Sequence, residues 1–198
     1  MEGNLYKNKY RIKSCRYEGW DYSNDGCYFI TICTENRKLF FGDVIGGKMI
    51  LNNFGIIIRN EWNKSGVIRK EIILDYFVVM PNHLHAIVVI DNDNVETNGR
   101  SSVEMDGRSS LREPDRSSVH YKNNFRMEKK SISSLMAGFK SATTKIINEK
   151  RNQPGAKIWQ NNYYDRIIRN EDELNRIRQY IIDNPYKWGL DRNNPKNF

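Results

Sequence analysis

The sequence lacks several features that define whole classes of protein. Its three cysteines have spacings that fit neither a disulfide framework nor a CxxC metal site. The longest strongly apolar run, residues 76–90, is interrupted by proline and histidine and is too short to span a bilayer, so we expect no membrane association. Residues 1–16 are basic and polar and do not resemble a signal peptide. These absences predict a cytoplasmic protein.

What the sequence does contain is an excess of basic charge, and this excess is unevenly placed. The 198 residues include 32 Lys and Arg against 24 Asp and Glu, and the 38% of hydrophobic residues is enough for a real core. Residues 1–119 hold 16 basic and 16 acidic side chains, so the net charge of 16 − 8 = +8 lies in residues 120–198. Near the N-terminus, cations also alternate with tyrosines. Cations mixed with aromatic rings are typical of a nucleic-acid surface, and a solvated basic surface is the alternative.

The apolar pattern predicts strands and helices in the first half of the chain. Residues 26–34 alternate and are rich in β-formers, which predicts a strand. Apolar side chains at helical spacing predict an amphipathic helix over residues 52–65. The β-branched runs 76–80 and 83–90 are separated by Pro81-Asn82, which predicts a hairpin of two well-buried strands.

Residues 91–119 are polar and repetitive, unlike the segments before them. An Arg-Ser-Ser triplet recurs there every eight residues, and 4 basic minus 7 acidic side chains gives a net charge of −3, so we expect a flexible surface insertion.

Helical spacing resumes at Ser131, and a last helix is expected to begin at Asn170 and to end before Pro185. A further strand is expected within residues 155–168.

This order of elements predicts the fold class. Strand, helix, two strands, insertion, helix, strand and helix fit an α+β fold, in which helices pack on one face of an antiparallel sheet. The length of the chain is that of one ordinary domain. We therefore expect a single domain over residues 1–198.

The sharpest motif is His83-Leu84-His85. Side chains two apart in a strand point to the same face, so the two imidazoles converge while Leu84 and Ala86 turn into the core. Two neighbouring rings in an apolar strand are costly unless something, such as a metal, uses their lone pairs. The alternative is a pair of hydrogen-bonded histidines at a sheet edge.

The last predicted helix carries candidate partners for these histidines. Tyr180 and Asn184 are four residues apart and share a face, and both flank the apolar stripe of the helix. If that stripe docks on the sheet near His83 and His85, the phenol and the amide border the metal. The alternative for Tyr180 is an ordinary amphipathic aromatic at the edge of a helix.

These residues carry a resemblance to a known family. His83-Leu84-His85 resembles the His-hydrophobic-His signature of single-tyrosine transposases of the insertion-sequence type. The segments 158–169 and 180–185 are similar to those of the REP-associated branch. The resemblance covers nearly all of the chain outside residues 91–119. It implies a ferredoxin-like fold and a transposase-like enzyme that cuts and rejoins single-stranded or hairpin DNA.

The resemblance also implies roles for particular residues. It places Mg²⁺ or Mn²⁺ on His83 and His85, with Asn184 completing the metal sphere where relatives often carry Gln. It makes Tyr180 the nucleophile, which forms a 5′-phosphotyrosine. Relatives often have His where this chain has Arg166. The implied protein is a monomer or a homodimer.

Other side chains are secondary candidates. Tyr163 and Tyr164 are rival nucleophiles, but neither is followed four residues later by Asn or Gln at a helix end. A DNA- or RNA-binding module on the same fold, without catalysis, is the alternative function. Six cations are candidate DNA contacts: Lys7, Lys9, Arg11, Lys13, Lys140 and Arg169.

Overall fold

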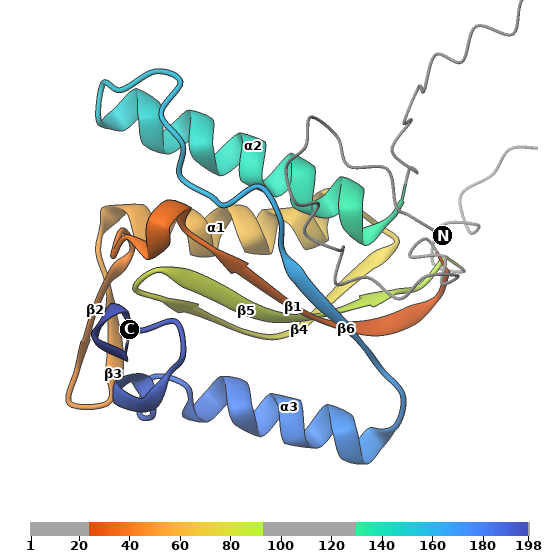
Figure 1. Cartoon of the computed structure of the whole chain (residues 1–198). Coiled ribbons are helices and arrows are strands. Elements are labelled where there is room, and N and C mark those ends of the chain that lie inside the picture. Colours follow the sequence, from red (N-terminus) through yellow and green to blue (C-terminus); the bar gives the residue numbers. More distant parts are fainter. Residues whose placement is uncertain (1–23, 93–129, 198) are drawn as a thin grey trace, which may run out of the picture.

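A four-stranded antiparallel sheet forms the centre of the molecule (Figure 1). The computed structural model describes residues 24–92 and 130–197. The strands lie in the order β4-β5-β1-β6, so β5 and β1 are central and β4 and β6 are the edges. Their bounds are Gly26–Cys33 for β1, Ile72–Met80 for β4, His83–Ile90 for β5 and Tyr164–Ile168 for β6.

Three helices cover the sheet. Helices α1 (Asn53–Ile68) and α2 (Ile132–Lys150) lie on one face, and α3 (Glu171–Asp183) lies on the other (Figure 1). The element order β1-α1-β4-β5-α2-β6 with this strand order is the ferredoxin-like arrangement. The predicted α+β fold is confirmed. The expectation that the helices pack on one face holds for α1 and α2 and is wrong for α3.

The reason for helices on both faces is that the sheet is apolar on both. The larger core lies under α1 and α2 and contains Trp62 and Phe139 against alternate residues of β1 and β5. A second core lies under α3 and contains Phe29, Ile87 and Ile181. An uncovered second face would leave these side chains in water, so α3 buries it.

The helix starts follow from local capping chemistry. The Asn52 side chain accepts hydrogen bonds from the backbone at the start of α1, and Ser131 forms a capping box with Ser134 at the start of α2. Asn170 accepts from the Glu173 backbone N–H and begins α3. All three starts were predicted from the sequence and are confirmed.

A short hairpin between β1 and α1 was not predicted. Strands β2 (Gly42–Ile45) and β3 (Lys48–Leu51) pair through a turn at Gly46 and Gly47, whose φ angles are 56° and 75°. Two successive residues with positive φ are the signature of a tight hairpin turn. The apolar residues of these strands, Val44-Ile45 and Met49-Ile50-Leu51, are consecutive, so the alternation typical of a strand is missing from the sequence.

Residues 184–197, which we call the C-terminal segment, fold back beside this hairpin. They contain two short 3₁₀ turns, Trp188–Leu190 and Pro195–Asn197. The segment ends near the turn between β4 and β5 (dark blue in Figure 1), where the Asn82 side chain donates to the Asn193 carbonyl at 2.7 Å.

Some sequence predictions fall outside the described residues. The basic and aromatic stretch near the N-terminus lies in residues 1–23, and the predicted insertion, apart from Asp91 and Asn92, lies in residues 93–129. Among the helices of the described ranges, none has the length and apolar character needed to cross a membrane.

Candidate active site

The two histidines of the motif lie on a central strand, not at a sheet edge. Their side chains point from β5 to the α3 face and are 0% and 1% exposed, and their ring centroids are 4.5 Å apart. Leu84 and Ala86 point to the opposite face, as the strand period predicts. The Trp188 ring lies 5.9 Å from the His83 ring. Buried rings in this position need partners for their nitrogens.

Asn82 determines which nitrogen of His83 carries the proton. The Asn82 amide nitrogen donates to the carbonyls of Arg37 and Asn193, at 3.0 and 2.7 Å. Its Oδ1 therefore faces His83 Nδ1 at 2.8 Å and accepts the Nδ1–H hydrogen bond. The lone pair of His83 is left on Nε2, which has no hydrogen-bond partner among the described residues.

His85 joins the nucleophile candidate to the sheet. Its Nδ1 lies 2.7 Å from the Thr31 hydroxyl on β1, and its Nε2 lies 3.1 Å from the Tyr180 hydroxyl. With the proton on Nδ1 donated to Thr31, the Tyr180 O–H donates to Nε2. The Phe29 ring lies edge-on to the Tyr180 ring at 6.0 Å and stacks on His85 at 5.3 Å. The phenol and the histidine pair thus meet, as expected if the apolar stripe of the last helix docks on the sheet near His83 and His85.

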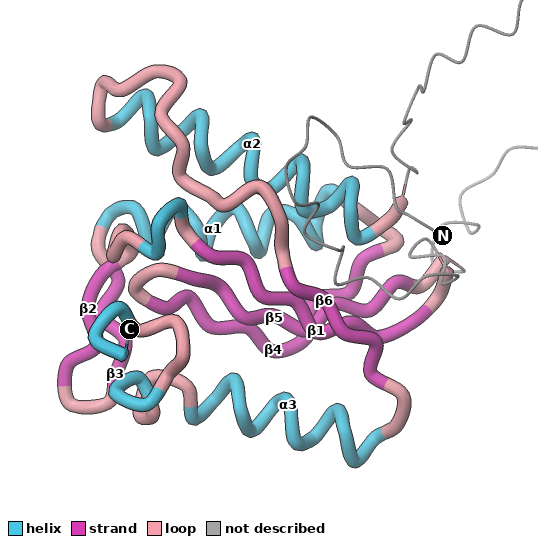
Figure 2. The backbone as a smooth tube through the Cα atoms, in the orientation of Figure 1, coloured by secondary structure: helices cyan, strands magenta, loops and turns pink. Residues whose placement is uncertain are grey.

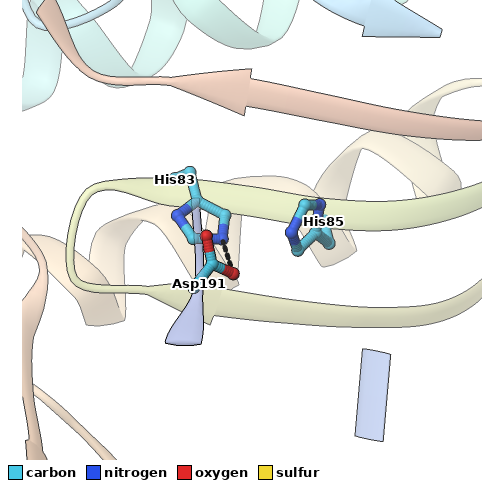
Figure 3. Close-up of side chains that lie close together, drawn as sticks. All are labelled: His83, His85 and Asp191. Carbon is cyan, nitrogen blue, oxygen red and sulfur yellow. Dashed lines mark ion pairs between the residues drawn. The ribbon is translucent and has the colours of Figure 1, made fainter. Parts of the chain in front are cut away.

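Asp191, in the C-terminal segment, supplies a carboxylate to the histidines (Figure 3). One ligand atom from each of His83, His85 and Asp191 lies within 4.8 Å of the others, and Asp191 Oδ2 is 3.9 Å from His83 Nε2. The carboxylate is held in place by the Asn193 backbone N–H at 2.6 Å. This cluster could bind a metal ion.

The protonation states suit such a site. Burial lowers the pKa of His83 from 6.5 to about 4, against the opposing effect of the Asp191 charge. Burial also lowers the pKa of His85 well below 6.5, and the His83 charge acts in the same direction. Both rings are therefore neutral at pH 7, and neutral imidazole is the form that binds a metal.

The nucleophile candidate is protonated in this state. Burial raises the pKa of Tyr180 above its usual 10, and the Asp191 charge adds to this effect. The residue is nevertheless 41% exposed, so it is partly open to solvent.

Asn184, the predicted third ligand, lies beside this cluster and contacts Asp191. Its side-chain nitrogen donates to Asp191 Oδ2 at 3.0 Å, and the residue is 2% exposed. Its Oδ1 has no hydrogen-bond partner among the residues that the structure describes. The amide orients the carboxylate, and its free oxygen is available as a further ligand.

The remaining described candidates lie elsewhere. Lys140 on α2 donates to the carbonyls of residues 160–162, in the loop before β6 (Figure 2). Arg169 is exposed next to the start of α3, at the opposite end of that helix from Asn184. Tyr163 is half-buried beside Ser133, and Tyr164 is exposed on β6. The candidate contacts Lys7, Lys9, Arg11 and Lys13 lie outside the described residues.

Asp191 was missed by the sequence interpretation. It follows α3 in an irregular segment, where no periodicity indicates which way a side chain points. One signal was available, because Asp191 is the only acidic residue among residues 184–198, which also hold three cations. A lone acid in such a segment suits a metal that already has two histidine ligands.

The fold and the buried histidine–carboxylate cluster define a class that can be compared with known proteins. No protein-family model matches the sequence. A solved structure, described as a REP-associated tyrosine transposase bound to a REP hairpin, has a similar fold, with a TM-score of 0.53 and 18% sequence identity. The similarity covers 89% of this chain and 77% of that chain.

A closer sequence relationship exists with a protein of Haemophilus influenzae. That protein, described as uncharacterized, is 31% identical over 180 residues, which are 91% of this chain and 91% of the relative. The chain belongs to the family of that Haemophilus influenzae protein.

Proposed function

We propose that this chain is a metal-dependent, transposase-like enzyme that cuts and rejoins single-stranded DNA at hairpins through Tyr180. The observation that carries the proposal is the 3.1 Å contact between the Tyr180 hydroxyl and Nε2 of His85, within the cluster of two neutral histidines and Asp191. The similar fold of a transposase bound to a REP hairpin supports the substrate class.

The reaction exchanges one phosphate ester for another. The Tyr180 oxygen attacks the phosphorus, the bond from phosphorus to the 3′-oxygen breaks, and the phenol proton is transferred, through solvent or a neighbouring group, to the released 3′-oxygen, which becomes a hydroxyl. The protein is left joined to the 5′-phosphate. Because the number of ester bonds is unchanged, a 3′-hydroxyl can reverse the reaction without another energy source.

The residues of the site fit a divalent cation, which we propose to be Mg²⁺ or Mn²⁺. His83 and His85 would hold it through Nε2 and Asp191 through a carboxylate oxygen, and Asn184 is the candidate for a fourth contact. When bound, such an ion supplies Lewis-acid polarisation of a phosphate oxygen. Tyr180 would then exchange its hydrogen bond to His85 for the substrate, since one lone pair serves one partner.

The test is the detection of the covalent product. The protein is incubated with Mn²⁺ and a labelled single-stranded hairpin oligonucleotide and then run on a denaturing gel. We expect a protein–DNA adduct that EDTA prevents and that Tyr180→Phe abolishes. The control is Tyr186→Phe, since Tyr186 is 82% exposed in the C-terminal segment and should leave the adduct unchanged.

The other outcomes are equally informative. An adduct that persists in Tyr180→Phe would place the nucleophile elsewhere, with Tyr164 as the next candidate. Tight hairpin binding by the wild type without any adduct would favour the non-catalytic nucleic-acid-binding module instead.

A further inference from the structure

Arg192 is an exposed cation of the C-terminal segment. It follows Asp191 directly, and its carbonyl accepts a hydrogen bond from the Arg37 guanidinium at 2.9 Å. Its own guanidinium lies over the Tyr164 ring, with Cζ 5.8 Å from the ring centroid. The backbone anchor and the ring together hold this charge at a fixed place.

A chain of aromatic contacts links that place to the nucleophile candidate. The Tyr164 ring lies edge-on to the Phe29 ring at 6.4 Å, and Phe29 in turn contacts both Tyr180 and His85. The Arg192 charge also lowers the pKa of Tyr180, against the larger effects of burial and Asp191. Arg192 and Tyr180 are therefore connected through the Tyr164 and Phe29 rings on the same face of the sheet.

Three arginines of the fold are paired with carboxylates, and Arg192 is not one of them. Arg69 pairs with Glu71, Arg166 with Glu173, and Arg178 with Asp75. Within residues 24–92 and 130–197, no carboxylate lies in ion-pair range of the Arg192 guanidinium. An unpaired guanidinium on the same face as a nucleophile candidate is suited to a phosphate, whose oxygens match its parallel N–H donors.

We propose that Arg192 binds a non-bridging oxygen of the phosphate that Tyr180 attacks, with Tyr164 as the ring that holds the guanidinium in position. The inference rests on the proposed function and adds a residue that contacts the reacting group. As the ester exchange proceeds, charge increases on the phosphate oxygens, so the contact becomes stronger in the transition state.

The experiment compares two substrates that differ in one group on the scissile phosphorus, a non-bridging oxygen or a methyl group. One hairpin oligonucleotide carries the ordinary scissile phosphate, and the other carries a methylphosphonate there, resolved into its two stereoisomers. Adduct formation is measured under single-turnover conditions for wild type, Arg192→Gln and Arg192→Lys. Lys196→Gln is the matched control, since Lys196 is an exposed cation in the same segment.

On the ordinary phosphate, we expect Arg192→Gln to slow adduct formation by about 100-fold. Arg192→Lys should be intermediate, because it keeps the charge and loses the paired donors. Lys196→Gln should match wild type. On the methylphosphonate stereoisomer that lacks the contacted oxygen, wild type and Arg192→Gln should react at similar rates, since there is no contact left to lose.

An equal loss on the phosphate and on both methylphosphonates would show that Arg192 acts through the structure of the site, and would overturn the inference. An Arg192→Gln enzyme as fast as wild type would also overturn it while leaving the proposed function intact. If wild type forms no adduct on the ordinary phosphate, the proposed function fails and the assignment of Arg192 fails with it.

Discussion

The buried amide of Asn82 connects three parts of the candidate site. Its nitrogen binds the carbonyls of Arg37 and Asn193, so it joins the chain after β1 to the C-terminal segment. Its oxygen accepts from His83 Nδ1 and so directs the free lone pair of the ring toward Asp191. The tautomer of the histidine and the position of the carboxylate thus depend on the same side chain.

The buried state of His83 predicts a pH dependence of folding. Its pKa is about 4 in the folded protein and about 6.5 when unfolded, so the unfolded state binds an extra proton between these values. Without metal, the unfolding free energy should therefore fall as the pH drops from 6.5 toward 4, by roughly 3 kcal/mol from this group. Urea unfolding at pH 7 and pH 4.5 measures the change.

Carboxylates also titrate in this range, so the comparison needs a variant. His83→Gln cannot gain a proton and should show a clearly smaller fall in unfolding free energy between the two pH values. A fall of the same size in wild type and variant would mean that His83 is not held neutral by burial.

At the scale of elements, the close approach of α1 to the chain before β2 depends on a glycine. A Cβ at Gly55 would collide with the carbonyl oxygen of Phe41, and the Leu51 side chain is also near. We expect Gly55→Ala to lower the unfolding free energy by roughly 1–3 kcal/mol, in spite of the better helix propensity of alanine.

Gly138 in α2 provides the matched control. It is also a helical glycine, but a Cβ there would meet only the Arg69 guanidinium, at 3.6 Å. Gly138→Ala should therefore be neutral or stabilise the protein by up to ~1 kcal/mol. Thermal and urea unfolding of the two variants check this, and similar stabilities for both would contradict the packing argument.

The elements that the sequence predicted are those with strong local signals. Capping side chains define the starts of α1, α2 and α3, and the alternation of β5 places His83 and His85 on one face. The helical stripe of α3 places Tyr180 at the edge of the buried face, and we assumed that this stripe docks near the histidines; the observed contact of Tyr180 with His85 agrees with that assumption.

The features that the sequence prediction missed were missed for different reasons. Strands β2 and β3 have four residues each and lack alternation, and the signal that could have found them, Gly46-Gly47 between two short apolar runs, was not used in the sequence analysis. Asp191 reaches His83 in a segment that is anchored by the contact of Asn193 with Asn82, 111 residues away along the chain. The single acidic charge of this segment is a local signal, but no local property shows where the segment folds, and the same holds for the meeting of Arg192 with Tyr164.

At the scale of the whole molecule, the net charge predicts how DNA binding responds to salt. The +8 lies in residues 120–198, which include α2, β6, α3 and the C-terminal segment. For three phosphate contacts, single-strand affinity should fall about 20-fold between 50 and 200 mM salt. Fluorescence anisotropy with a labelled hairpin measures this, and affinity that is insensitive to salt would contradict phosphate contacts. Arg192→Gln should reduce the logarithmic slope by about 0.7.

The position of Asp191 in the chain has a consequence for synthesis. Strand β6, which completes the sheet, ends at Ile168, so 191 − 168 = 23 further residues must be added before the carboxylate exists. At ribosomal speeds this takes about one to five seconds. The two imidazoles are therefore made well before their acidic partner, so the complete set of three ligands, and with it the full ability to capture a cation, should arise late in translation.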